Sequence, residues 1–158
     1  MYRIAVSLIV AAVFFTECSD DKFANERSQM LQAKLKWEQA KNSTVAGYSF
    51  NSESLCFCAF EVPNKVTLTV LSDTVSAAVE RDSQEKVADS LLNRYETIDR
   101  WFSIIDSCID RNPDLMRIIY DENSGYPKDI YFDYIENVAD DEFSHKNDSL
   151  QLIYRSAL

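Results

Sequence analysis

Apolar and polar side chains alternate along six short stretches of the chain, and this two-residue period is the strongest constraint on its fold. The stretches are residues 48–50, 66–70, 75–79, 116–120, 130–134 and 150–154. Such alternation is typical of β-strands that bury one face. Segments with a helical period precede the first and fourth stretches, and short links favour antiparallel pairing. The expected fold class is therefore α+β. A single antiparallel sheet of five to six strands carries two main helices, in the order helix, three strands, helix, three strands.

Two segments carry the helical period. The first covers residues 19–41, where Met30, Ala33 and Trp37 recur on one face. The second runs through residue 111 from Thr97, a residue type that caps helix N-termini. Its expected apolar face consists of Ile98, Trp101, Phe102, Ile105, Cys108 and Ile109.

A tight turn is predicted between the fourth and fifth strands. It contains Ser124, Gly125, Tyr126 and Pro127, and glycine and proline are residues that turns prefer. The flanking strands should then form a β-hairpin. Gly125 is expected at positive φ, where a residue with a Cβ atom is strained.

The N-terminus has the pattern of a secretory signal peptide. Arg3 gives a positive start, residues 4–15 are apolar, and residues 16–21 are polar. We expect residues 1–17 to be a signal peptide and residues 19–158 to form a single α+β domain. Cys18 lies where a bacterial lipoprotein carries its acylated cysteine, and is the lipidation candidate. Glu17 departs from the small residue expected before such a cysteine, so a membrane-anchored lipoprotein and a soluble periplasmic or secreted protein both remain open.

Composition limits the class of partner. The net charge is -10, which argues against nucleic acid, because phosphates demand a basic surface. The same charge disfavours binding to anionic lipid, so membrane association is expected only through a lipid anchor on Cys18. The partner is expected in the envelope or outside the cell, and its identity is left open. Hydrophobic residues make up 46% of the chain, which argues against disorder.

Several short motifs occur in an order that resembles one known family. They are Trp37, Tyr48-Ser49-Phe50, Cys56-Phe57-Cys58, Thr97-Ile98-Asp99 leading to Phe102, Tyr120-Asp121, Gly125-Tyr126-Pro127 and Ile130. Over roughly residues 37–145 the chain resembles the uncharacterised family of bacterial secreted proteins and lipoproteins catalogued as domain of unknown function 6174. The resemblance implies an exported domain of the cell envelope. It implies no reaction and transfers no catalytic residue.

Two cysteines lie one residue apart in the apolar run LCFCAF, residues 55–60. The apolar phase shifts between Phe50 and Leu55, which indicates a β-bulge or a tight turn there. Export favours a disulfide, and Cys56 and Cys58 would point to the same face of a strand. Their Cα atoms would be about 6.6 Å apart in a regular strand, so a direct bond needs local distortion. Cys108 is the rival partner, and fully reduced cysteines are the third alternative.

The sequence contains no strong motif for a metal site or a cofactor-binding site. A structural zinc site needs four ligands, whereas the chain has one Cys-x-Cys pair and a single histidine, His145, in what reads as a solvated acidic loop. Asp140, Asp141 and Glu142 are weak calcium candidates without the EF-hand spacing. The chain has two glycines, too few for a phosphate-binding loop. We therefore expect no metal and no cofactor.

The sequence thus favours an exported cell-envelope or secreted domain that binds a partner or has a structural role, and that is not an enzyme. The alternative is an envelope thiol–disulfide or hydrolytic enzyme that uses Cys56 and Cys58. A free thiol of low pKa in a cleft would favour the enzyme.

Residues 1–17 or so are expected to be absent from the mature protein, because signal peptides are removed on export. Intact mass measurement or N-terminal sequencing of natively exported material tests this. Met1 on the exported protein would contradict it, whereas added mass of lipid size on Cys18 would decide for a lipoprotein.

Overall fold

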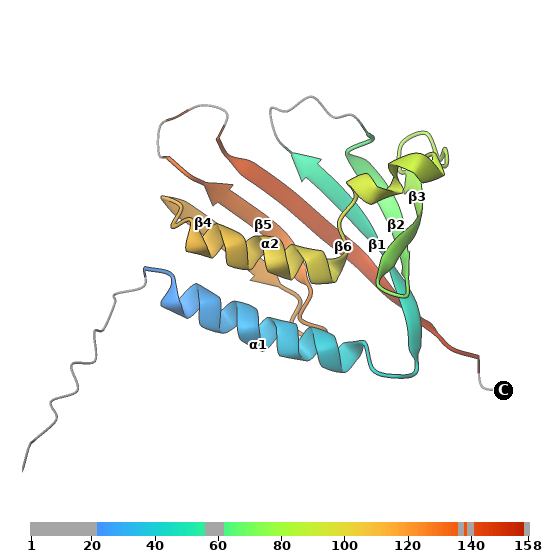
Figure 1. Ribbon diagram of the computed structural model, residues 1–158, viewed down its shortest axis with the longest axis horizontal. Coiled ribbons are helices and arrows are strands. Elements are labelled where there is room, and N and C mark those ends of the chain that lie inside the picture. The colour runs from blue at the N-terminus through green and yellow to red at the C-terminus, as the bar shows by residue number, and fades with distance from the viewer. Residues whose placement is uncertain (1–21, 56–61, 136–137, 139–140, 157–158) are drawn as a thin grey trace, which may run out of the picture.

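Six strands form one antiparallel sheet, and both α-helices lie on the same face of it (Figure 1). This computed structural model describes residues 22–55, 62–135, 138 and 141–156. The elements are α1 (Ala24–Ala40), β1 (Val45–Leu55), β2 (Lys65–Leu71), β3 (Thr74–Glu80), the 3-10 helix η1 (Asp89–Arg94), α2 (Ile98–Asp110), β4 (Leu115–Tyr120), β5 (Pro127–Asp133) and β6 (Phe143–Tyr154). The predicted α+β class and the order of helices and strands are confirmed.

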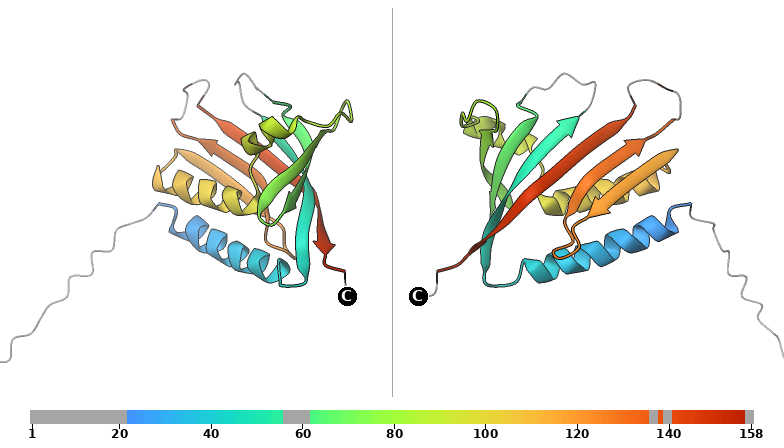
Figure 2. Two further views of the ribbon diagram at one scale, coloured as in Figure 1. Left: turned by 45° about the vertical axis from the view of Figure 1, so that its right-hand side comes forward. Right: turned by 180° about the vertical axis from the view of Figure 1, so that it is seen from behind.

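The strand order is β3-β2-β1-β6-β5-β4, so the first and last strands of the chain meet in the middle of the sheet. β1 pairs with β6 from Val45 opposite Tyr154 to Leu55 opposite Ser144. Between β3 and β4 the chain passes through η1 and α2 to reach the far edge. The view from behind in Figure 2 shows the opposite face of the sheet without a helix.

The core lies between the two helices and the sheet. Every residue of the expected apolar face of α2 is buried, and Thr97 Oγ1 accepts a hydrogen bond of 3.2 Å from the backbone N–H of Arg100. α1 buries Met30, Ala33 and Trp37. Arg27 joins the helices, because its guanidinium lies 2.6 Å from Asp106 and 2.7 Å from Asp110 on α2.

The prediction of a bulge or turn between Phe50 and Leu55 was wrong for β1 itself. β1 pairs with β2 without a register shift from Gly47 to Glu53. The extra residue lies opposite, in β6, where Ser149 has φ 55°. The apolar phase appeared to shift because the inward positions after Phe50 are the serines Ser52 and Ser54 rather than apolar residues.

The prediction that His145 lies in a solvated loop was also wrong. β6 begins at Phe143, not near residue 150, and His145 is 1% exposed. Its alternation was hidden because His145 and Asn147 are polar residues that face inward. Their buried positions require hydrogen-bond partners, which the neighbouring strand supplies.

The hairpin between β4 and β5 is confirmed, and its turn rests on α1. Gly125 has φ 78°, as predicted. A Cβ atom at Gly125 would overlap the carbonyl oxygen of Ala33 and come within 2.8 Å of Lys36 Cβ. The Asp121 carboxylate closes the turn by accepting bonds from the backbone N–H groups of Asn123 and Ser124, at 3.1 and 2.8 Å.

The helices of the described part of the chain are too short or too polar to cross a membrane.

Gly125→Ala should lower the free energy of unfolding by about 2 kcal/mol or more, because the positive φ strains alanine and the new methyl group meets α1. Denaturant unfolding measures this. Asn123→Ala in the same turn is the control, and it should change stability by less than about 0.5 kcal/mol. Equal stability of the two variants would contradict this role of the glycine.

Candidate functional site

A cluster of polar side chains is buried where β1 and β6 pair. In this histidine cluster, made of Ser52, Ser54, His145 and Asn147, Ser52 is opposite Asn147 and Ser54 is opposite His145. His145 Nδ1 lies 2.8 Å from Ser54 Oγ, and Nε2 lies 3.2 Å from Ser52 Oγ and 3.0 Å from Asn147 Oδ1. The cluster fills inward positions that the neighbouring residues of both strands fill with apolar side chains.

The hydrogen bonds fix which imidazole nitrogen carries the proton. Asn147 donates its Nδ2–H to the carbonyl oxygen of Pro127 at 2.9 Å, so its Oδ1 atom faces His145 as an acceptor. His145 Nε2 must therefore be the donor, and Nδ1 accepts from the Ser54 hydroxyl. Because Nε2 already carries a proton, it cannot take one from Ser52. The Ser52–His145 pair thus lacks the arrangement that activates a serine nucleophile.

Burial also keeps this histidine neutral. Loss of solvent lowers the pKa of His145 to about 4, although the Asn147 hydrogen bond opposes the change. The imidazole packs on Trp101 of α2, with ring centroids 3.9 Å apart, and lies nearly parallel to Phe143 at 6.2 Å. The cluster therefore fixes the position of two aromatic rings that also line a surface groove.

This groove, the α2 groove, lies between α2 and the ends of β5 and β6. Its volume is about 500 Å³, within the range of small-molecule sites. The sheet side presents Phe132, Tyr134 and Phe143. The helix side presents Glu96, Arg100, Trp101, Ile104, Ser107, Cys108 and Arg111. Four aromatic rings and one aliphatic side chain make the groove suited to an apolar ligand.

Cys108, Tyr134 and Arg111 form the end of the groove near the C-terminus of α2. Cys108 Sγ lies 2.9 Å from Tyr134 Oη, and the Arg111 guanidinium lies 5.9 Å from the centre of the Tyr134 ring. Burial raises the pKa of the Cys108 thiol. Burial, followed by the hydrogen bond to Cys108, raises the pKa of Tyr134 to about 12. Both groups are therefore protonated at neutral pH, and Cys108 lacks the low pKa of a nucleophilic thiol.

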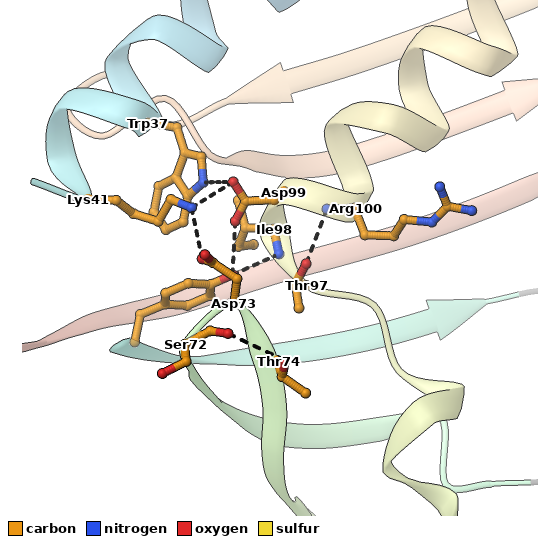
Figure 3. Close-up of polar contacts among 10 residues, drawn as sticks. Trp37, Lys41, Ser72, Asp73, Thr74, Thr97, Ile98, Asp99 and Arg100 are labelled. Carbon is orange, nitrogen blue, oxygen red and sulfur yellow. Dashed lines mark hydrogen bonds and ion pairs between the residues drawn. The ribbon is translucent and has the colours of Figure 1, made fainter. Parts of the chain in front are cut away.

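A second polar group, the Asp99 junction, lies at the other end of α2 (Figure 3). The Asp99 carboxylate accepts bonds from Trp37 Nε1 at 3.2 Å, Lys41 Nζ at 2.7 Å and Tyr48 Oη at 3.5 Å. Tyr48 Oη in turn accepts the backbone N–H of Ile98 at 3.1 Å. Burial, followed by the Asp99 charge, raises the pKa of Tyr48. These groups bond to one another across three elements, so the junction joins α1, β1 and α2.

The predicted site residues are only partly brought together. Cys18, Cys56, Cys58 and Asp140 lie outside the described residues, so the disulfide, lipidation and calcium hypotheses stay predictions. Cys108 is a free, buried thiol in the structure. Asp141 and Glu142 lie just before β6, and the described residues contain no group of three potential metal ligands within reach of one ion. Gly125 and Pro127 belong to the turn, and Pro127 also binds the histidine cluster through its carbonyl oxygen.

The sequence model of a family of unknown function matches residues 29–152. The chain belongs to this family, DUF6174. The DUF6174 match includes the Asp99 junction, the histidine cluster and every residue that lines the α2 groove. No curated protein and no solved structure matches the chain. The resemblance to the family is therefore confirmed, and the motifs that carried it from Trp37 to Ile130 all fall within the match.

Sequence reasoning missed the groove and the histidine cluster. Trp101 and Cys108 were predicted to be core residues, and their second role depends on which sheet residues α2 faces. The two serines after Phe50 are the one signal that could have revealed the cluster. They continue the inward phase of β1, and a buried serine pair needs a polar partner.

Unfolding experiments at different pH values should detect the buried histidine. The folded-state pKa of about 4 lies below the unfolded value near 6.5, so the unfolded chain binds the proton more readily. The contribution of His145 to stability should therefore be nearly constant above pH 6.5 and fall by about 3 kcal/mol between pH 6.5 and 4. His145→Gln, which removes the chain's single histidine, should abolish this part of the dependence while leaving the carboxylate titration below pH 4. Parallel pH profiles of the two proteins would contradict the buried, neutral state.

Proposed function

We propose that this DUF6174 chain is an exported binding domain of the cell envelope or the secreted fraction, without catalysis of its own, and that the α2 groove is its binding site. The observation that carries the proposal is the apolar lining of the groove. Trp101, Phe132, Tyr134 and Phe143 converge on about 500 Å³ of space from three elements, α2, β5 and β6, and from the segment that follows β5. Aromatic and aliphatic walls of this kind bind a ligand by removing its apolar surface from water.

The core holds the side chains that line the groove in fixed positions, which supports ligand binding rather than catalysis. Trp101 is 5% exposed and Phe132 is fully buried, so both rings are held in place by the core before any ligand arrives. Preorganised walls reduce the entropy that a ligand must lose on binding. The protonated Cys108 thiol and the protonated Tyr134 hydroxyl are no general bases at neutral pH, and the low pKa of His145 makes its imidazole a weak base.

Export is proposed from the sequence of residues 1–17, and a lipid anchor on Cys18 would place the groove at a membrane surface. The enzyme alternative depends on Cys56 and Cys58. Neither thiol has a described position, and the thiol that does, Cys108, has a raised pKa.

A fluorescent dye tests the groove directly. N-phenyl-1-naphthylamine is neutral and apolar, and its emission rises when it leaves water, so emission should rise on titration with the protein. Ser107→Phe should weaken dye binding at least about tenfold, because the new ring occupies the groove.

Ser103→Phe is the matched control. Both serines are exposed on α2 and both donate to the carbonyl oxygen four residues earlier, but Ser103 lies outside the groove lining. Equal loss of dye binding in the two variants, or no binding by the wild-type protein, would reject the groove as a binding site.

A further inference from the structure

One end of the α2 groove carries a positive charge that forms no ion pair with a carboxylate of the described residues. The lining contains three charged side chains, Glu96, Arg100 and Arg111. Arg100 lies 3.7 Å from Glu96, so these two charges offset each other at the N-terminal end of α2. Arg111 lies against the Tyr134 ring and makes no ion pair with another residue of the described ranges. In a chain of net charge -10, an unneutralised guanidinium beside an apolar groove favours a ligand with an anionic group.

We propose that the groove binds a single-chain anionic amphiphile, an unbranched alkyl chain with a carboxylate head, and that Arg111 binds the carboxylate. This inference rests on the proposed function, because it names the ligand class for the same groove. A guanidinium matches a carboxylate with two parallel hydrogen bonds, and a charge-assisted bond of this kind is stronger than a neutral one. The alkyl chain then extends from Tyr134 along α2 towards the Trp101 ring.

The length of the groove sets the length of the alkyl chain. Arg111 caps the C-terminus of α2 and lies ten residues after Trp101, which is about 15 Å along the helix axis. An extended chain advances about 1.2 Å per bond, by analogy with the extended backbone. A chain of about twelve carbons therefore spans from the guanidinium to the indole. Ile104 and Ser107 lie between these ends on the same side of α2.

The protonation states of Cys108 and Tyr134, the neighbours of Arg111, also favour an anionic head group at this end of the groove. Cys108 and Tyr134 both have raised pKa values, so neither adds a negative charge beside Arg111 at neutral pH. The Tyr134 hydroxyl lies 2.9 Å from Cys108 Sγ, and the Arg111 guanidinium lies 5.9 Å from the centre of the same ring, so the hydroxyl is a second donor at this end of the groove. An amine head group would instead meet the guanidinium with like charge.

Competition against the bound dye tests the head group. Dodecanoate should displace N-phenyl-1-naphthylamine at a concentration about tenfold lower than dodecylamine, with both kept below their micelle concentrations. Arg111→Gln should weaken dodecanoate about tenfold and leave dodecylamine unchanged or tighter, whereas Arg111→Lys should restore part of the preference. Thermal melts of each variant check that α2 remains folded.

Arg117→Gln is the matched control, because Arg117 is an exposed arginine on β4 outside the groove lining. It should leave the preference for dodecanoate intact. Equal displacement by dodecanoate and dodecylamine, or a preference that survives Arg111→Gln, would overturn the carboxylate assignment while the dye still binds and the proposed function stands. Failure of the dye itself to bind would overturn both.

Discussion

The Asp99 carboxylate holds together the parts on which the rest of the structure depends. It accepts hydrogen bonds from α1 through Trp37 and Lys41, and from β1 through Tyr48. It also lies in the first turn of α2, where a negative charge is favourable beside the helix N-terminus. The position and start of α2 follow from this junction. Since α2 forms one wall of the groove, the junction at one end of the helix fixes a site that extends to the other end. It also gives a physical reason why Trp37, Tyr48 and Asp99 occur together in the motifs that resemble DUF6174.

The histidine cluster supports the same wall from the sheet side. The middle of the sheet, where β1 meets β6, would ordinarily be apolar, but here His145 lies between two serines and Asn147. A satisfied polar group inside a core specifies one register, because any slip of β6 would leave the imidazole without partners. The Trp101 ring stacks on the His145 and Phe143 rings, so the register of β6 also fixes the positions of the Trp101 and Phe143 rings in the groove. An apolar ligand would therefore meet a surface whose shape is fixed before binding.

Charge distinguishes the groove from the rest of the molecule. The chain is strongly acidic, and several of its arginines and lysines in the described ranges form ion pairs with carboxylates, as Arg27 and Arg117 do. Arg111 lies beside an aromatic ring instead. A cation that packs on an apolar wall can bind an anion without first losing another partner, which is the physical basis for assigning a carboxylate ligand to this end of α2.

The sequence by itself determined the fold class, the order of the elements, the cap and buried face of α2, and the positive φ of Gly125. Each of these depends on periodicity or on backbone preferences that act within a few residues. It did not reveal that β6 starts at Phe143 or that β1 continues past Phe50, because Ser52, Ser54, His145 and Asn147 are polar residues at inward positions. Such residues fit a core only when they face one another, and the two strands that carry them are about ninety residues apart in the chain. The groove was likewise decided by tertiary structure, since it exists only where α2 lies across β5 and β6, and no local pattern specifies which rings that packing places along it.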